Sequence, residues 1–152
     1  MRHWVLRAAG AALVAWGAVT PAAVQAGEFL SVAERAAVLY DAPSVRAKKI
    51  FVASQLYPVE VIVSVDNWVK VRDASGDLAW IERRLLSDRR TVLIKTPVAD
   101  VRQAAQENAP LAFQAREGVA LDLAEMGPAG WVKVRHRDGQ SGFVRVSQVW
   151  GL

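Results

Sequence analysis

The chain has 152 residues and no cysteine, which excludes disulfide bonds, thiol catalysis and thiolate metal sites. Its formal net charge at pH 7 is only +4, so the composition gives little reason to expect a polyanion as the partner. Because no disulfide bond can form, the stability of the fold has to come from packing.

The first 26 residues follow the pattern of a secretory signal peptide. Arg2 and Arg7 give a positively charged start, residues 8–19 form an uncharged apolar run, and small residues lead to a cleavage site after Ala26. This run is shorter than the roughly 20 residues of a membrane-spanning helix, although an uncleaved anchor is the alternative. We therefore expect an exported, periplasmic protein that begins at Gly27 and has no membrane span after cleavage.

Two segments near the start of the predicted mature chain fit more than one structure. Residues 32–39 have some helical spacing but lie where a first strand is expected. Residues 44–55 fit either a loop with a strand or a single helical turn. The next segment, residues 58–65, alternates in the manner of a strand. Its valines are expected on one face: Val59, Val61, Val63 and Val65.

The sequence WVKVR at residues 68–72 predicts a further strand. Val69 and Val71 are expected to fill the core. The alternation then sends three side chains outward: Trp68, Lys70 and Arg72. A polar turn over residues 73–77 and another strand over residues 78–82 are expected to follow.

The same series of motifs occurs twice. WVKVR returns at Trp131, 63 residues after Trp68, and at this offset Gly76 in the turn falls on Gly139. The offset of the preceding strand is 62, so one residue has been inserted in the loop before the tryptophan. The chain is therefore expected to contain two copies of one structural unit.

Other pairs of residues extend this repeat. Val38 and Val101, again 63 apart, are expected to open the two units, and Trp80 falls on Phe143. By their alternation, Trp80 and Phe143 are expected in the core. Each unit closes with an apolar pair after a short helical turn: Leu85–Leu86 and Val149–Trp150.

Short strands with frequent turns predict an all-β fold made of two tandem small barrels. We place the first domain at residues 27–90 and the second at residues 91–152. Residues 87–90 make a short, charged linker, so the two domains are expected to pack against each other. Trp150 is expected to cover the second barrel or the seam between the domains.

Three motifs follow one another in the first unit: LYPVEVI from Leu56, DNWVKVRD from Asp66 and LLSDRRTVLI from Leu85. The second unit contains GWVKVR from Gly130 and ends in VWGL from Val149. In this order the motifs resemble a bacterial SH3-like (SH3b) domain protein of the exported, two-repeat type. The resemblance covers nearly all of the predicted mature chain and implies two SH3-like barrels after a cleaved signal peptide.

The sequence departs from this family at two places. SH3b units often open with Asn-x-Arg, whereas the first unit has LYD at residues 39–41. The usual Gly-Trp is Ala79-Trp80 in the first unit and Gly142-Phe143 in the second. The family's usual opening contacts are therefore not carried over to the first unit.

No enzymatic activity, metal site or cofactor is expected. The cell-wall peptidases that SH3b units accompany need a Cys-His pair or a zinc site, and this chain offers neither. His3 lies in the predicted signal peptide, and His136 alone, expected in a solvated turn, cannot complete a metal site or a catalytic triad. The acidic residues lie on expected turns or strand edges, where no cleft would raise a carboxyl pKa.

Basic residues near the end of the chain raise a nucleic-acid hypothesis, because cationic faces with aromatic residues bind single strands. These residues are Lys133, Arg135, Arg137 and Arg145. Asp122 and Asp138 dilute the patch, and an exported protein meets little nucleic acid. Ordinary surface charge is the preferred interpretation, and no nucleic-acid partner is expected.

The expected outer face combines indoles with cationic side chains, an arrangement that can hold a peptide or the face of a sugar. The ligand-binding candidates are Tyr57, Trp68, Arg72, Trp131 and Arg135. Two alternatives remain for the tryptophans. Each could cap the open end of its barrel, or the two indoles could meet between the domains.

These features lead to two functional hypotheses. The first is a non-catalytic periplasmic binding module whose ligand is peptidoglycan or a periplasmic peptide. The choice of cell wall rests on family analogy. The alternative is a structural or adaptor protein that docks on another envelope protein through a strand edge or the groove between its domains. Exposed Trp68 and Trp131 favour the first hypothesis, whereas buried indoles and an open apolar edge favour the second.

Overall fold

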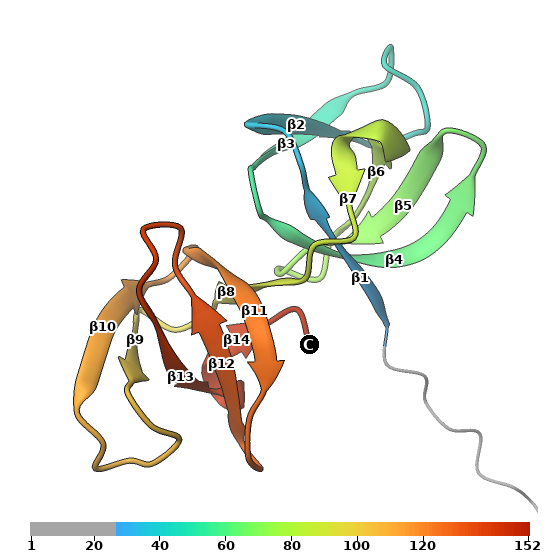
Figure 1. The fold of residues 1–152 in the computed structure, drawn as a ribbon. Helices are drawn as coiled ribbons and strands as arrows, with labels where there is room; N and C mark the ends of the chain where they lie inside the picture. The colour runs from blue at the N-terminus through green and yellow to red at the C-terminus, as the bar shows by residue number, and fades with distance from the viewer. Residues whose placement is uncertain (1–26) are drawn as a thin grey trace, which may run out of the picture.

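The computed structural model describes residues 27–152, and the predicted signal peptide lies outside this range. Regular structure in these residues consists of strands and two single turns of 3-10 helix. The strands form two separate seven-stranded antiparallel sheets, one for each repeat (Figure 1). The fold is therefore all-β and consists of two tandem SH3-like units, as the sequence predicts.

The first repeat contains β1 to β7. Its elements are β1 (Glu28–Val32), β2 (Ala36–Tyr40), β3 (Lys49–Ser54), β4 (Pro58–Val65), β5 (Trp68–Arg72), β6 (Leu78–Glu82), η1 (Arg83–Leu85) and β7 (Leu86–Ser87). The strand order is β3-β2-β6-β5-β4-β1-β7, so the last strand of the repeat pairs with its first. The strand β3 lies at one edge of the sheet.

The second repeat contains β8 to β14 in the equivalent order, β10-β9-β13-β12-β11-β8-β14. Its elements are β8 (Thr91–Ile94), β9 (Val98–Arg102), β10 (Leu111–Arg116), β11 (Ala120–Met126), β12 (Trp131–Arg135), β13 (Ser141–Arg145), η2 (Val146–Gln148) and β14 (Val149–Trp150). In both repeats the final strand follows a single helical turn, which confirms the turn predicted before Val149–Trp150; in the first repeat Leu85 ends the turn, so only Leu86 of the predicted pair lies in the closing strand.

Each repeat has its own hydrophobic core, which its sheet encloses. Val69 and Val71 are fully buried in the first core, and Val132 and Val134 occupy the same places in the second. The first core also contains Leu30, Val32, Leu39, Val59 and Ile81. The second also contains Val92, Ile94, Val101, Leu121 and Val144. The inward direction predicted for the valines of WVKVR is confirmed.

The two ambiguous segments are resolved as strands and loops. Residues 32–39 span the end of β1 and most of β2, so their helical spacing was misleading. Residues 44–55 are part of a loop followed by β3. The predicted turns are also present, because Gly76 and Gly139 have positive φ angles of 92° and 96°.

The valines of β4 do not share one face, contrary to the prediction. The register with β5 shifts between Val61 and Val63, which leaves Ile62 as an extra residue. Val59 and Val61 pack on the core, whereas Val63 and Val65 are exposed beyond the bulge. The second repeat has the same irregularity in β11, between Leu123 and Glu125.

The predicted match of Val38 with Val101 is wrong by one residue. Leu39 and Val101 are the equivalent core residues, both fully buried. Hydrogen bonds fix this register, because the amide of Leu56 donates to Val32 and the amide of Gly118 donates to Ile94. The offset is therefore 62 throughout the first part of each repeat.

Trp80 and Phe143 do not lie in the core, which also corrects the prediction. Alternation in β6 instead buries Ala79 and Ile81 and turns Trp80 outward, where it is half-buried. Phe143 is half-buried at the equivalent position of β13. The ammonium groups of Lys70 and Lys133 lie 5.9 Å and 5.8 Å from the respective ring centres.

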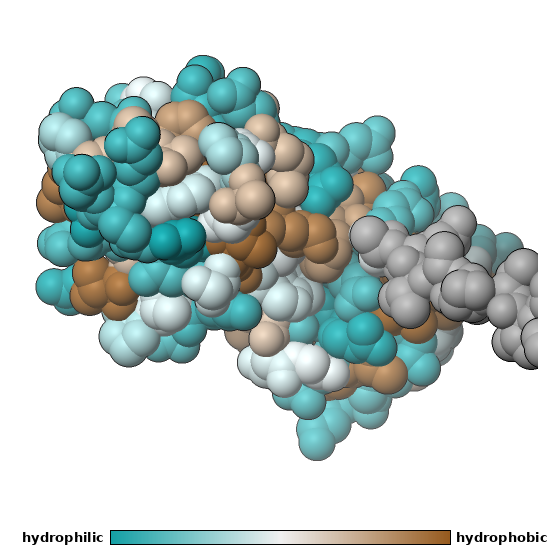
Figure 2. Space-filling model, turned by 90° about the horizontal axis from the view of Figure 1, so that it is seen from below, coloured by the Kyte–Doolittle hydropathy of each residue, from teal (hydrophilic) through white to brown (hydrophobic). Residues whose placement is uncertain are grey.

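The two repeats meet at a seam built from the linker and the last residues. The rings of Phe29 and Trp150 pack edge to face with their centres 5.1 Å apart, which agrees with the prediction for Trp150. The hydroxyl of Thr91 donates a 2.7 Å hydrogen bond to the carbonyl of Leu56. Seen from below, apolar residues gather in the middle of the face, between two largely hydrophilic lobes (Figure 2).

Candidate functional site

Trp68 lies on the outer side of the first sheet, at the start of β5. Its side chain is half-buried, and its ring packs edge to face against Tyr40, with centres 5.6 Å apart and an interplanar angle of 84°. Trp80 lies beside them, because it pairs with Tyr40 on one side and with Lys70 on the other. We call this set the aromatic face: Tyr40, Trp68, Lys70 and Trp80.

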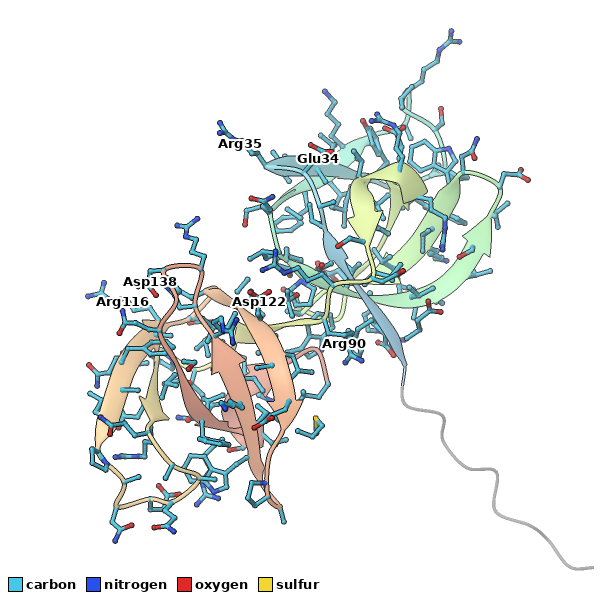
Figure 3. The ribbon with its side chains drawn as sticks, in the orientation of Figure 1. Glu34, Arg35, Arg90, Arg116, Asp122 and Asp138 are labelled. Atoms are coloured by element: carbon cyan, nitrogen blue, oxygen red, sulfur yellow. The ribbon has the colours of Figure 1, made fainter. Side chains whose placement is uncertain are left out.

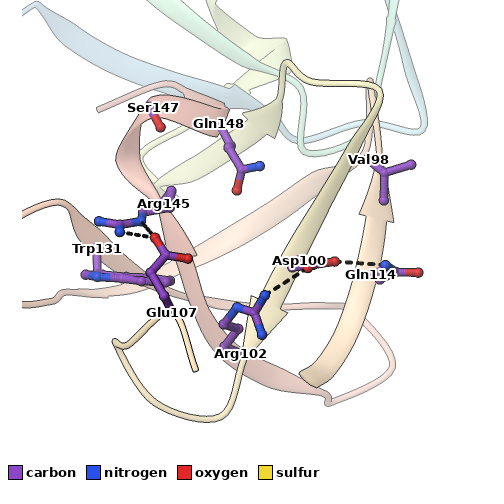
Figure 4. A pocket seen from close by; sticks show the side chains of 9 residues that line it. All are labelled: Val98, Asp100, Arg102, Glu107, Gln114, Trp131, Arg145, Ser147 and Gln148. Atoms are coloured by element: carbon purple, nitrogen blue, oxygen red, sulfur yellow. Dashed lines mark hydrogen bonds and ion pairs between the residues drawn. The ribbon is translucent and has the colours of Figure 1, made fainter. Parts of the chain in front are cut away.

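Trp131 is the equivalent of Trp68 but is almost inaccessible, with 6% of its surface exposed. The guanidinium of Arg145 lies 4.4 Å from the centre of its ring, and Glu107 pairs with that guanidinium (Figure 4). A stacked cation of the chain itself therefore occupies the place that a ligand would need. Trp131 lies on the outer side of its strand, as the alternation predicts, but Arg145 covers its ring, so it is not an exposed indole.

A single position explains much of this difference. In the cross-strand pairing, Trp131 lies opposite Arg145, whereas Trp68 lies opposite Glu82. Glu82 carries no positive charge to stack on the indole, and it is paired with the exposed Arg84 instead. The indole of the first repeat is consequently the more open of the two.

The second sheet keeps an aromatic ring or a lysine at three positions of the aromatic face and differs at the position of Tyr40. Arg102 takes the place of Tyr40 and pairs with Asp100, while it also donates a hydrogen bond to the carbonyl of Ala109. Asp100 in turn accepts a hydrogen bond from Gln114 (Figure 4). These side chains line a groove of about 570 Å³ in which most polar groups already have partners within the chain.

Arg72 and Arg135 lie far from the tryptophans of their own strands. Each arginine is the last residue of a five-residue strand that begins with the tryptophan, so the two residues are separated by about 13 Å along the strand. Arg72 forms an ion pair of 2.7 Å with Glu60. Arg135 is exposed and lies beside Arg89. The Nε and Nη2 atoms of Arg89 each donate a hydrogen bond to the carboxylate of Asp122.

Tyr57 is also separate from the aromatic face. Its ring lies 5.5 Å from that of Phe51, and its hydroxyl accepts a hydrogen bond from the amide of Ala74. Burial raises the pKa of the Tyr57 hydroxyl, and the nearby carboxylate of Asp73 acts in the same direction. The five predicted site residues therefore do not form one site.

Sequence reasoning missed Tyr40 and Trp80 as partners of Trp68. Tyr40 follows the buried Leu39 in β2, so its outward direction could have been read from alternation once that strand was known. The ring of Trp80 was assigned to the core on account of the wrong alternation in β6. The contact between Tyr40 and Trp68 joins residues that are distant in sequence, and no local pattern reveals it.

His136 lies in the turn between β12 and β13 and is half-buried beside Phe113. Its Nδ1 lies 3.0 Å from the carboxylate of Asp138. Hydrogen bonds from the backbone and side chain of Gln140, and then from His136, lower the pKa of Asp138 to about 2. Within residues 27–152, no three His, Asp or Glu residues gather as metal ligands, and no helix is long and apolar enough to cross a membrane.

The family model for the bacterial SH3 domain matches the chain twice, at residues 33–88 and 95–151. The chain belongs to the bacterial SH3 domain family. The comparison with curated proteins gives no match. Domains of this family are typically binding modules without catalytic residues of their own.

Solved structures with similar folds include NlpC1 from Trichomonas vaginalis, at 12% identity and a TM-score of 0.39. This match covers 84% of the present chain and 47% of NlpC1. An NlpC/P60 family protein from Bacillus cereus is similar at 16% identity and a TM-score of 0.38, over 80% of this chain and 55% of that protein. The chain spans about half the length of these structures.

Proposed function

We propose that the protein is a non-catalytic binding module of the bacterial cell envelope. Its ligand is peptidoglycan or a periplasmic peptide, and it binds at the aromatic face of the first repeat. Membership of a family of binding modules supports this proposal. The signal-peptide pattern of residues 1–26 supports export to the periplasm, and we keep 27–90 and 91–152 as the proposed domain limits.

The observation that carries the proposal is the partly open indole of Trp68, which lies edge to face with Tyr40 and on which no cation of residues 27–152 stacks. A flat apolar ring with a polar rim can pack against a sugar face or a peptide side chain. Lys70, beside Trp80, can meet a negatively charged group of the same ligand. The second repeat has no equivalent open indole, because Arg145 covers Trp131.

Sedimentation of the mature protein with insoluble peptidoglycan sacculi tests the proposal. Trp68→Ala is expected to weaken binding about tenfold, as is common for a central aromatic contact. The matched control is Phe143→Ala, which truncates an outward aromatic ring on the other repeat and is expected to bind as the parent does. Circular dichroism checks that both variants fold. A folded Trp68→Ala variant that sediments like the parent would refute the proposed site.

A second candidate function, docking on another envelope protein, is favoured by the edge strand β3. Its middle residues are apolar and exposed, with Ile50 at 49%, Phe51 at 39% and Val52 at 57%. An edge strand with free backbone groups can pair with a strand of a partner. A photo-crosslinker at Ile50 should then capture one discrete envelope protein, and Val52→Lys should abolish that product. A crosslink pattern unchanged by Val52→Lys would argue against docking at this edge.

A further inference from the structure

A second concave surface lies between the two repeats, away from the aromatic face. This groove of about 640 Å³ is lined by segments of both repeats. The first repeat contributes Arg35, Ser54, Gln55 and Leu56, and the second contributes Gly118, Val119, Ala120, His136 and Arg137. Arg35 stands at the tip of the β1–β2 turn, and Asp138, next to Arg137, lies across the gap between the repeats (Figure 3).

The groove is cationic. Two arginines line it, and no carboxylate does. Neither Arg35 nor Arg137 forms an ion pair with another residue of 27–152. Asp138, the carboxylate nearest to His136, is already bonded to His136 and Gln140.

The repeat provides an internal comparison for these charges. The amides of Gln55 and Glu117 donate to the carbonyls of Arg35 and Pro97, so Pro97 is the counterpart of Arg35. The counterparts of His136 and Arg137, 63 residues earlier, are Asp73 and Ala74. The positive charges therefore occur only in the copies that face the groove. Inheritance from a common repeat does not explain them.

The walls of the groove are held in place by the seam. The carbonyl of Leu56 accepts the hydrogen bond from Thr91, and Arg90 donates a 2.9 Å hydrogen bond to the carbonyl of Gly151. Leu56 has a φ of 70°, in the left-handed region, where its counterpart Gly118 has a φ of 81°. A leucine in this conformation is unfavourable by roughly 1–2 kcal/mol. Strain of this kind is characteristic of functional surfaces.

We propose that the groove between the repeats binds carboxylate groups of an acidic peptide. Each guanidinium can hold a carboxylate through two parallel hydrogen bonds, and two guanidiniums on opposite walls suit a chain with more than one acidic group. The aliphatic side chains of Leu56, Val119 and Ala120 offer contact area to the uncharged part of such a peptide. This inference rests on the proposed function only in taking the ligand to be a peptide.

The test uses fluorescein-labelled hexaglutamate and the anisotropy of its emission, with the mature protein at low ionic strength. Arg35→Ala and Arg137→Ala are each expected to weaken binding about tenfold. The double variant Arg46→Ala/Lys95→Ala removes exposed positive charge outside the groove, and it is expected to bind as the parent does. Both groove arginines are exposed, so the variants are expected to fold normally.

Three results would overturn the proposal. The first is that the control double variant loses as much affinity for hexaglutamate as the groove variants do. The second is that both groove variants bind hexaglutamate as the parent does. The third is that inorganic phosphate displaces hexaglutamate at an equal concentration of anionic groups. The last would identify a general anion site. Trp68→Ala is expected to bind hexaglutamate normally. A parent protein that binds hexaglutamate at the groove but does not sediment with sacculi would exclude peptidoglycan as the ligand of the aromatic face and support the groove.

Discussion

Replacing Gly142 with alanine tests how closely β13 approaches β9 in the second repeat. A Cβ atom at this position would lie 2.5 Å from the carbonyl oxygen of Arg102 and 2.9 Å from Cγ1 of Val101. The oxygen belongs to the backbone, so it cannot move aside as a flexible side chain would. The first repeat carries Ala79 at the equivalent, buried position, so its strands leave room for a methyl group.

The loss of stability expected for Gly142→Ala follows from the contact that the added Cβ atom would make with β9. Forcing one extra carbon into a closely packed core typically costs 1–3 kcal/mol, and we expect about 2 kcal/mol for Gly142→Ala. For a domain of this size, such a loss lowers Tm by about 10 °C. The reciprocal change, Ala79→Gly, leaves a gap and loosens the chain, and we expect it to cost about 1 kcal/mol.

Thermal unfolding followed by circular dichroism measures both losses. Hydrogen exchange read by mass spectrometry then shows which repeat is affected. Gly142→Ala should increase exchange in residues 91–152, whereas Ala79→Gly should increase it in residues 27–90. A Gly142→Ala variant whose Tm is unchanged, or whose exchange increases in the first repeat, would refute the reasoning from the close approach of the strands.

Three further changes probe the seam and the turns. Thr91→Val removes the buried hydroxyl that donates to the carbonyl of Leu56, so the free energy of unfolding is expected to fall by about 1 kcal/mol, measured by urea denaturation. An unchanged urea midpoint would count against this hydrogen bond. Gly139→Val places a branched side chain at a φ of 96° and should destabilise the second repeat by about 2 kcal/mol, seen as a lower Tm, although no neighbouring atom obstructs it. The folded-state pKa of Asp138 lies at about 2, below its ordinary value of 3.8, so its contribution to stability is present above pH 4 and is lost as the pH falls towards 2. The stability of Asp138→Ala should therefore fall less steeply than that of the parent as the pH drops from 4 to 2. Parent and variant curves of stability against pH that run parallel would contradict the lowered pKa of Asp138.

Local patterns in the sequence were sufficient for most strands and turns, whereas residues 32–39 and 44–55 fitted more than one structure. Alternation in WVKVR predicted the burial of its two valines, because a strand with one face on a core has a period of two. The positive φ of Gly76 and Gly139 follows from the turn chemistry of Asp-Gly and Ser-Gly segments. The repeat itself was visible because WVKVR recurs at a fixed offset.

The errors share a physical cause, since each depends on a contact with another strand. The bulge at Ile62 reverses the faces of β4 after Val61, and a bulge is defined by the partner strand. Trp80 was expected in the core on account of its alternation, but Ala79 and Ile81 are the residues that pair with the core valines of β5, so Trp80 faces outward.

The candidate site was predicted only in part for the same reason. Trp68 and Trp131 have the same local sequence, yet Arg145 covers the indole of Trp131, whereas no cation in the described part of the chain covers that of Trp68. The groove between the repeats combines Arg35 with Arg137, which are separated by most of the mature chain. Neither feature produces a pattern within a single strand.

The closure of each sheet by its own last strand has a consequence for synthesis. In the first repeat, Leu86 and Ser87 of β7 pair with β1, so this sheet can close before the second repeat is available. Phe29, however, finds its ring partner only when Trp150 arrives at the end of the second repeat. Before that, the guanidinium of Arg90, 5.6 Å from the ring centre, covers one face of Phe29 and leaves its edge apolar and open. A chaperone that recognises apolar side chains would find its target there.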